Sequence, residues 1–309
     1  MSQDESVNYD DFQGSTFPDL SVLYPDEFYF MHSCAKYITF DANEPVIVEG
    51  QTGEYLYLVK SGQLRVNKRH GGNIYEVGSV NPGDIFGEAS VLYNSTAGAE
   101  VRAIDGCELY AIPADKVREL FESNERFLRA ATQMAERRAA ASSLAVNPIF
   151  TTLPLAVREV ALYNAKFVNI KEGDVLIREG DSDVRFMFIM LAGEAQVSMR
   201  HPTNPSKRII FANLVSGDEA GEIAVITERP HGATVTATAP VRLLVISNDA
   251  ILAWSDRHSD FAYALYGQVH RKLKTNRQVL RTIIDDRDAR SLTTNSIPSL
   301  DAFKEKHDL

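Results

Sequence analysis

Short apolar runs alternate with turn residues over most of the chain. Runs rich in Val, Ile, Tyr and Phe are separated by Gly, Pro, Asn and Asp about every eight to twelve residues, which is typical of antiparallel strands in a sandwich or roll. In the first half, the strands are predicted at Lys36 to Phe40, Tyr55 to Lys60, Gln63 to Lys68, Ile74 to Val80 and Leu109 to Pro113.

Segments with helical spacing flank these runs. The apolar positions Phe127, Leu128, Ala131, Met134 and Ala135 mark one face of a helix that is expected to join two halves of the chain. The helices are predicted at Ala114 to Leu120, Glu125 to Leu144, Leu153 to Ala165, Asp249 to Trp254 and Asp260 to Ile284.

The two halves form an internal repeat. Pro82-Gly83-Asp84-Ile85-Phe86-Gly87-Glu88 matches Ser216-Gly217-Asp218-Glu219-Ala220-Gly221-Glu222 at a separation of 134 residues (217 minus 83). The segment from Ala97 to Ala103 matches His231 to Ala237 at the same separation, and Glu-Gly pairs at Gly50 and Gly180 precede matching strands. We therefore expect two copies of one fold: domain A at 27–145 and domain B at 146–284, with an N-terminal extension at 1–26 and a flexible tail at 285–309.

Charge and composition narrow the function classes. A net charge of -10 disfavours general binding to nucleic acid or anionic lipid, and no apolar run is long enough to span a membrane. The first residues lack the pattern of a signal peptide, and two cysteines, Cys34 and Cys107, are too few for a disulfide framework. We expect a cytoplasmic protein without a membrane partner.

The basic segments do not change this picture. Arg137 and Arg138 lie on a strong helical pattern and are interpreted as a solvated helical face. The last predicted helix is locally basic (His258, His270, Arg271, Lys272, Lys274), but residues 287–309 lack the apolar stripes of a helix-turn-helix, so DNA binding is not expected.

Motifs of catalysis are missing from the sequence. It contains neither a Cys/His cluster with metal spacing nor a Walker loop nor a Gly-x-Ser-x-Gly elbow. We expect neither an enzyme nor a metal site.

The repeated Gly-Glu segments carry the candidate chemistry. Gly87-Glu88 and Gly221-Glu222 each begin one helical turn, which is followed by a loop. Backbone N–H groups in such a place can bind a phosphate, and the Glu can accept hydrogen bonds from sugar hydroxyls.

These residues resemble the phosphate-binding cassette of the cyclic-nucleotide-binding family, whose pattern is Phe-Gly-Glu, a few apolar residues, then Arg-Ala-Ala/Ser-Thr. We call residues 86–100 cassette A and residues 220–234 cassette B. The resemblance implies a mainly β protein with flanking helices, built from two tandem jelly-roll-like β-rolls. The chain is similar to regulatory subunits of cyclic-AMP-dependent protein kinase and to bacterial two-domain sensors. The resemblance therefore implies a non-catalytic regulator whose ligand is a cyclic nucleotide, either cyclic AMP or a related compound.

Both cassettes depart from the pattern at the phosphate-binding Arg, which is replaced by Ala97 and His231. A charge-assisted hydrogen bond contributes about 1.5 to 3 kcal/mol, so binding of cyclic AMP is expected to be weakened in both. Cassette A also carries Glu100 in place of Thr or Ser and is interpreted as degenerate, whereas cassette B keeps Thr234. The ligand-binding residues expected in cassette B are Gly221, Glu222, Ile223, Ala224, Arg229, His231, Gly232, Ala233 and Thr234, and those in cassette A are Gly87, Glu88, Ala89, Ser90, Ala97, Gly98 and Ala99.

Several alternatives stay open at this level. Glu88 and Glu222 could be surface carboxylates or carboxylates that brace a loop, and His231 could be an exposed loop residue. The stripe Leu265 or Tyr266, Val269, Leu273, Leu280 and Ile284 could dock on its own roll or form a homodimer. The protein could be a receptor that relays nucleotide or nucleoside binding, mainly in domain B, to a protein effector, or a ligand-independent scaffold for protein interaction.

Overall fold

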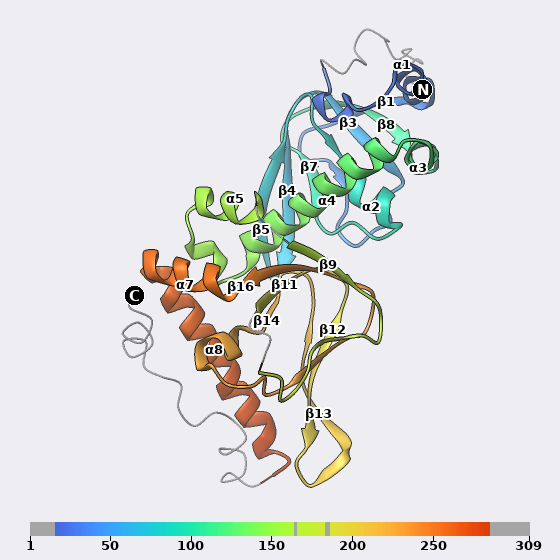
Figure 1. The fold of residues 1–309 in the computed structure, drawn as a ribbon. Coiled ribbons are helices and arrows are strands. Elements are labelled where there is room, and N and C mark those ends of the chain that lie inside the picture. Colours follow the sequence, from blue (N-terminus) through green and yellow to red (C-terminus); the bar gives the residue numbers. More distant parts are fainter. Residues whose placement is uncertain (1–15, 164–165, 183–185, 285–309) are drawn as a thin grey trace. The chain divides into compact units, whose positions relative to one another are not determined.

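The computed structural model describes residues 16–163, 166–182 and 186–284. The chain divides into two compact units, Met1–Ser142 and Ser143–Leu309, which we describe separately. Figure 1 shows that each contains a set of strands and the helices that follow it.

The first unit holds two antiparallel sheets of four strands. One sheet has the order β1-β8-β3-β6 and the other the order β2-β7-β4-β5. The strands are β1 (Lys36–Phe40), β2 (Pro45–Ile47), β3 (Tyr55–Ser61), β4 (Leu64–His70), β5 (Asn73–Val80), β6 (Ile85–Phe86), β7 (Glu100–Ala103) and β8 (Cys107–Pro113). Its helices are α1 (Pro25–Cys34), α2 (Glu88–Tyr93), α3 (Ala114–Ser123) and α4 (Glu125–Val146), which ends in the second unit, with a short turn η2 (Pro18–Leu20).

Strand β3 separates two cores because both of its faces are buried. Tyr57 and Val59 belong to the core between the two sheets. Leu56 and Leu58 point to the other face and pack in a core with side chains of α3 and α4. Successive side chains of a strand alternate between faces, which explains why this strand is a continuous apolar run.

The second unit repeats this architecture. Its sheets have the orders β14-β11-β16-β9 and β10-β15-β12-β13. The strands are β9 (Lys166–Ile170), β10 (Val175–Ile177), β11 (Phe186–Ala192), β12 (Ala195–His201), β13 (Asn204–Leu214), β14 (Glu219–Ala220), β15 (Thr234–Ala237) and β16 (Val241–Ser247). Its helices are α5 (Leu155–Tyr163), α6 (Glu222–Thr227), α7 (Asn248–Arg257) and α8 (Ser259–Arg281), with the turn η3 (Phe150–Thr152).

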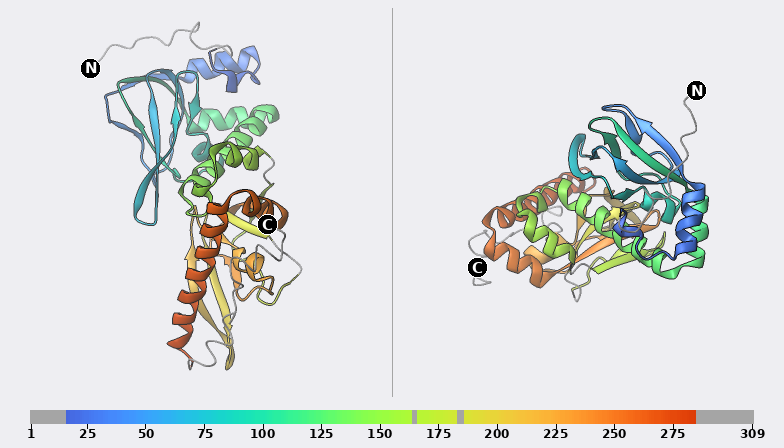
Figure 2. Two further views of the ribbon diagram at one scale, coloured as in Figure 1. Left: turned by 90° about the vertical axis from the view of Figure 1, so that its left-hand side faces the viewer. Right: turned by 90° about the horizontal axis from the view of Figure 1, so that it is seen from above.

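Helix α8 runs along the second unit and contacts α6 and β13 (Figure 2). Leu265, Val269, Leu273 and Leu280 of its apolar stripe are buried. Of the two interpretations of this stripe, docking on its own roll is therefore the one that the structure shows.

The sequence-based expectation of two tandem, mainly β rolls, each followed by helices, is confirmed. The segment that was expected to be an N-terminal extension contributes Phe17, Leu20 and Leu23 to the helical core of the first unit. Their spacing of three residues places them on one side of short helical turns. The predicted tail at 285–309 lies outside the described residues.

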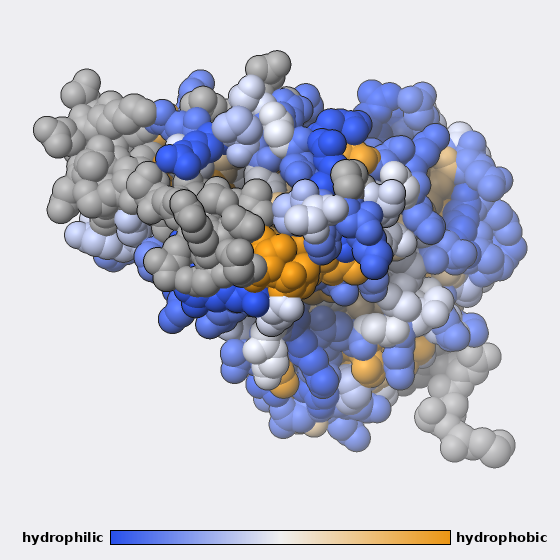
Figure 3. All heavy atoms as spheres, turned by 90° about the horizontal axis from the view of Figure 1, so that it is seen from below, coloured by the Kyte–Doolittle hydropathy of each residue, from blue (hydrophilic) through white to orange (hydrophobic). Residues whose placement is uncertain are grey.

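The surface agrees with the charged composition. Seen from below, most of the visible surface is hydrophilic, and the apolar side chains form one larger group and several small, separate ones (Figure 3). Exposed apolar side chains of the second unit include Ile210 and Ile283.

Candidate functional site

A left-handed glycine begins the helical turn of each cassette. Gly87 has φ 89° and Gly221 has φ 96°. A Cβ atom on Gly221 would lie 2.2 Å from the carbonyl oxygen of Phe186, so glycine is required by both conformation and space. The turn makes the following residue, Glu88 or Glu222, the first of α2 or α6.

The loop of each cassette is held by backbone hydrogen bonds to the Glu-Gly segment upstream. The N–H of Gly180 donates to the carbonyl of His231 (2.8 Å), and the N–H of His231 donates to the carbonyl of Asp181 (2.9 Å). Ala97 makes the equivalent pair of bonds with Gly50 and Gln51 in the first unit. The recurring Glu-Gly pairs therefore mark the segments that support the two loops.

A cavity of about 430 Å³ lies in the second unit and is lined by cassette B. Eight of the nine residues expected in this site line it: Gly221, Glu222, Ile223, Ala224, Arg229, His231, Gly232 and Ala233. Thr234 is not among the lining residues; its hydroxyl accepts a hydrogen bond from the N–H of Glu179. One wall is apolar, with Val197, Met199 and Phe211, and another comes from α8. This volume is in the usual range for small-molecule sites.

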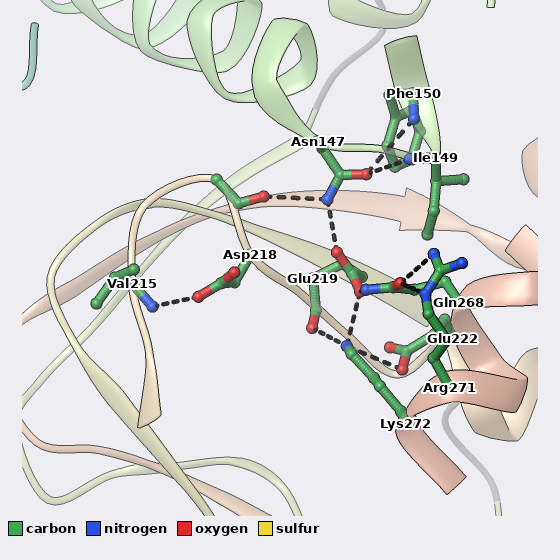
Figure 4. A network of polar contacts seen from close by, with 11 residues as sticks. Asn147, Ile149, Phe150, Val215, Asp218, Glu219, Glu222, Gln268, Arg271 and Lys272 are labelled. Atoms are coloured by element: carbon green, nitrogen blue, oxygen red, sulfur yellow. Dashed lines mark hydrogen bonds and ion pairs between the residues drawn. The ribbon is translucent and has the colours of Figure 1, made fainter. Parts of the chain in front are cut away.

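Glu222 forms one end of a polar network at this cavity (Figure 4). Its Oε1 lies 3.0 Å from the Nζ of Lys272, and its Oε2 is buried without a hydrogen-bond partner among the described residues. Lys272 also lies 2.7 Å from Oε1 of Glu219 and donates to the carbonyl of Glu219 (2.8 Å). One ammonium is thus shared by two buried carboxylates.

Burial and charge shift the pKa values of this group in different directions. Burial raises the pKa of Glu222, and the charge of Glu219 adds to this against the attraction of Lys272. Burial would lower the pKa of Lys272, but the charges of Glu222 and Glu219 raise it above its ordinary value. Lys272 therefore stays charged.

The first unit has a simpler version of this arrangement. Nη1 of Arg138 on α4 lies 3.1 Å from Oε2 of Glu88 and 2.6 Å from the carbonyl oxygen of Ile85. Burial raises the pKa of Glu88, and Arg138 opposes the shift. The interpretation of Arg138 as part of a solvated helical face was incomplete, because its guanidinium reaches the cassette glutamate.

Neither cassette glutamate is a surface carboxylate. The side chains are 5% (Glu88) and 2% (Glu222) exposed. His231 is 9% exposed and lines the cavity, so it is not an exposed loop residue. In cassette A, Ser90 and Ala97 are buried, Ala89 and Ala99 are half-buried, and Gly98 is exposed.

Sequence reasoning missed the residues that reach the cassettes from other elements. Arg138 and Lys272 are 134 positions apart, like the glutamates that they contact. The separation of the repeat could therefore have identified these two cations as equivalent residues of the sites. Glu219 was not predicted as a site residue, and its position in the repeat corresponds to the apolar Ile85.

A cation from another strand also contacts cassette A, which the sequence did not reveal. The Nζ of Lys68 on β4 donates to the carbonyl of Gly98 (3.2 Å), and the residue is 4% exposed. Burial lowers the pKa of Lys68. The Glu100 carboxylate, expected to repel a phosphate, accepts two hydrogen bonds from Arg102, which lower its pKa to about 2.

Two further properties concern residues 16–163, 166–182 and 186–284 of the chain. There, no helix has the length and apolar character needed to cross a membrane. In the same residues, no group of three or more His, Cys, Asp or Glu side chains is arranged to hold a metal ion.

Several known proteins with similar sequences are regulatory subunits. The chain is 27% identical over 209 residues to the cAMP-dependent protein kinase regulatory subunit of Yarrowia lipolytica, covering 68% of this chain and 51% of that protein. It is 30% identical over 210 residues to the same subunit of Blastocladiella emersonii, covering 68% and 49%. The chain thus spans about half the length of the curated relatives that it matches.

Two solved structures are also similar to this chain. The regulatory domain of Toxoplasma gondii PKA with cAMP is 26% identical, covers 74% of this chain and 84% of that one, and has a TM-score of 0.36. The regulatory subunit of a cAMP-independent protein kinase A from Trypanosoma cruzi bound to guanosine is 17% identical, covers 91% and 94%, and has a TM-score of 0.40.

The cyclic nucleotide-binding domain family matches residues 37–124 and 167–258. These two segments contain both cassettes, their glycine turns and both buried glutamates. The chain therefore belongs to the cyclic nucleotide-binding domain family and carries two copies of that domain in tandem.

Proposed function

We propose that this protein is a non-catalytic regulator that senses a cyclic nucleotide, or a related nucleotide or nucleoside, mainly through domain B. The observation that carries the proposal is the cavity of about 430 Å³, which is lined by Glu222, a buried carboxylate whose Oε2 has no hydrogen-bond partner among the described residues. A buried acceptor without a partner loses free energy that a hydroxyl or N–H donor of a ligand would restore. The apolar wall around Met199 suits a flat base.

The absence of the family arginine bears on the ligand class. His231 stands at that position and lines the cavity, as does Arg229. A ligand without a phosphate does not need the missing guanidinium, so a nucleoside is included among the candidates. A cyclic phosphate would depend on His231 or Arg229 for its countercharge.

The proposed relay runs through the helix that follows each roll. Lys272 connects Glu222 to α8, and a ligand that bonds Glu222 changes what Lys272 contacts. Such a contact would favour one arrangement of α8 over another. The relatives are named as regulatory subunits of a protein kinase, so the proposed effector is a protein kinase.

Calorimetry on the full chain tests this function. Cyclic AMP, cyclic GMP, a cyclic dinucleotide and guanosine are titrated separately into the wild type and into Glu222→Gln. We expect binding of at least one compound, weakened about tenfold or more by Glu222→Gln. Glu88→Gln alters the equivalent carboxylate of the first unit and should leave the affinity unchanged, as should Glu194→Gln at an exposed position.

The second candidate function is a ligand-independent scaffold, which the missing arginines favour. It predicts no heat with any of these compounds. It also predicts that Glu222→Gln leaves partner binding unchanged, whereas apolar positions of the helices are sensitive.

A further inference from the structure

Glu219 is a buried carboxylate at a position where the first repeat has an apolar residue. Glu219 in β14 corresponds to Ile85 in β6, since both precede the glycine turn by two residues. Ile85 is part of a hydrophobic core. Glu219 is 3% exposed. An ionised side chain at such a place needs a compensating set of donors.

Both oxygens of Glu219 have such donors (Figure 4). Oε1 accepts from Nε2 of Gln268 (2.9 Å) and lies 2.7 Å from the Nζ of Lys272, both on α8. Oε2 accepts from Nδ2 of Asn147 (2.6 Å). Burial would raise the pKa of Glu219, but the charge of Lys272 and these hydrogen bonds lower it, so the carboxylate is ionised.

Asn147 is the far end of this network. It is fully buried and also donates to the carbonyl of Gly217 (3.0 Å). Its Oδ1 accepts from the N–H groups of Ile149 (3.0 Å) and Phe150 (3.4 Å), which fixes the turn that begins the second unit. Asn147 is not among the residues that line the cavity in the described structure.

The sharing of Lys272 has a consequence for Glu222. Because the ammonium also bonds Glu219, it engages only one oxygen of Glu222, and the other oxygen is buried without a hydrogen-bond partner among the described residues. With an apolar residue at 219, Lys272 could turn fully to Glu222. The Glu222 carboxylate would then be neutralised by the Lys272 ammonium.

We propose that Glu219 is a positioning residue of domain B: it holds Lys272 so that one oxygen of Glu222 is left without a partner from the chain, and it couples the cavity residue Glu222 to Asn147. The inference rests on the proposed function, in which Glu222 binds the ligand. A ligand that bonds Glu222 weakens the contact between Glu222 and Lys272 and so strengthens the Lys272–Glu219 pair. The effect of binding then reaches Asn147 through the second oxygen of Glu219.

Amide hydrogen exchange on the full chain tests the coupling without a ligand. In Glu219→Ile, which installs the residue of the first repeat, we expect exchange about tenfold faster in peptides covering 147–153 and 265–276. Glu219→Gln keeps the shape and one acceptor oxygen, although its NH2 group cannot accept the second hydrogen bond. It should show a smaller change in the same peptides. Unchanged exchange in both segments of Glu219→Ile would overturn the inference.

Titrations with cyclic AMP and with guanosine test the effect on binding. Glu219→Ile and Asn147→Ala should each raise the dissociation constant about tenfold, although Asn147 lies outside the cavity. The matched control is Asn124→Ala, because Asn124 is also a buried Asn that accepts from a helical N–H (Phe127) and donates to a carboxylate (Glu27), but in the first unit. Equal affinities in Asn147→Ala and Asn124→Ala would contradict the coupling. If the wild type binds neither probe, the proposed function fails for these compounds, and the exchange result still decides the role of Glu219.

Discussion

Arg138 and Lys272 are equivalent residues of the two repeats. They are separated by 134 positions (272 minus 138), as are the glutamates that they contact (222 minus 88). Each donates to the cassette glutamate of its own unit and to the carbonyl of the residue three positions before it, Ile85 or Glu219. A cation from the helix after the roll is thus a repeated part of the site.

The first prediction concerns the stability that Lys272 provides. Lys272→Met removes the ammonium between two buried carboxylates, and breaking a buried ion pair from one side costs about 3 to 5 kcal/mol. We expect the free energy of unfolding at pH 7, measured by urea denaturation, to fall by this amount. Lys274→Met at an exposed position of α8 should change it by less than about 0.5 kcal/mol. Equal stabilities of the two variants would contradict the prediction.

The second prediction concerns pH. The pKa of Glu222 is raised above its ordinary 4.5. As pH rises from 4.5 towards the folded pKa, the unfolded state loses a proton that the folded state keeps, so stability is lost across this window. Glu222→Gln cannot ionise. We therefore expect the unfolding free energy of Glu222→Gln, minus that of the wild type, to increase as pH rises above 4.5 in urea titrations.

A difference for Glu222→Gln that falls as pH rises would show that the carboxylate is stabilised in its charged form.

The third prediction concerns the cavity wall. Asn67 pairs with Glu100, and Ser198 pairs with Thr234, so the next residues, Lys68 and Met199, occupy equivalent positions. Met199→Lys places in the second unit the side chain that the first unit carries at this site. We expect the ammonium to occupy the cavity and to weaken ligand binding in calorimetry by tenfold or more.

The reciprocal change Lys68→Met should leave that affinity unchanged, because it lies in the first unit. Unaltered binding by Met199→Lys would mean that the ligand does not contact this wall.

The fourth prediction concerns the glycine turn. Gly221→Ala forces a left-handed residue to carry a Cβ atom 2.2 Å from the carbonyl of Phe186. We expect a loss of about 2 kcal/mol or more in unfolding free energy. Gly232→Ala, where nothing lies within 4 Å of the added atom, should cost no more than about 0.5 kcal/mol. Similar losses in both variants would contradict the steric argument.

Much of the fold could be predicted from local patterns. Strand β1 has the predicted ends, and α4 begins at the predicted residue and extends two residues further, because alternation and helical spacing are properties of neighbouring residues. The duplicated Gly-Glu turns could also be found, since the glycine is required by the chain's own conformation. The sequence by itself therefore determined the two repeats, their class and the cassette loops.

The contacts made to the cassettes from distant parts of the chain were decided only by the tertiary structure. Lys68, Arg138 and Lys272 lie 20 or more positions from the residues they meet, at Gly98, Glu88 and Glu222. No local pattern distinguishes a lysine on a solvated helical face from one whose ammonium enters a buried site. That distinction depends on which elements the folded chain packs together, and on the donors that surround each buried charge.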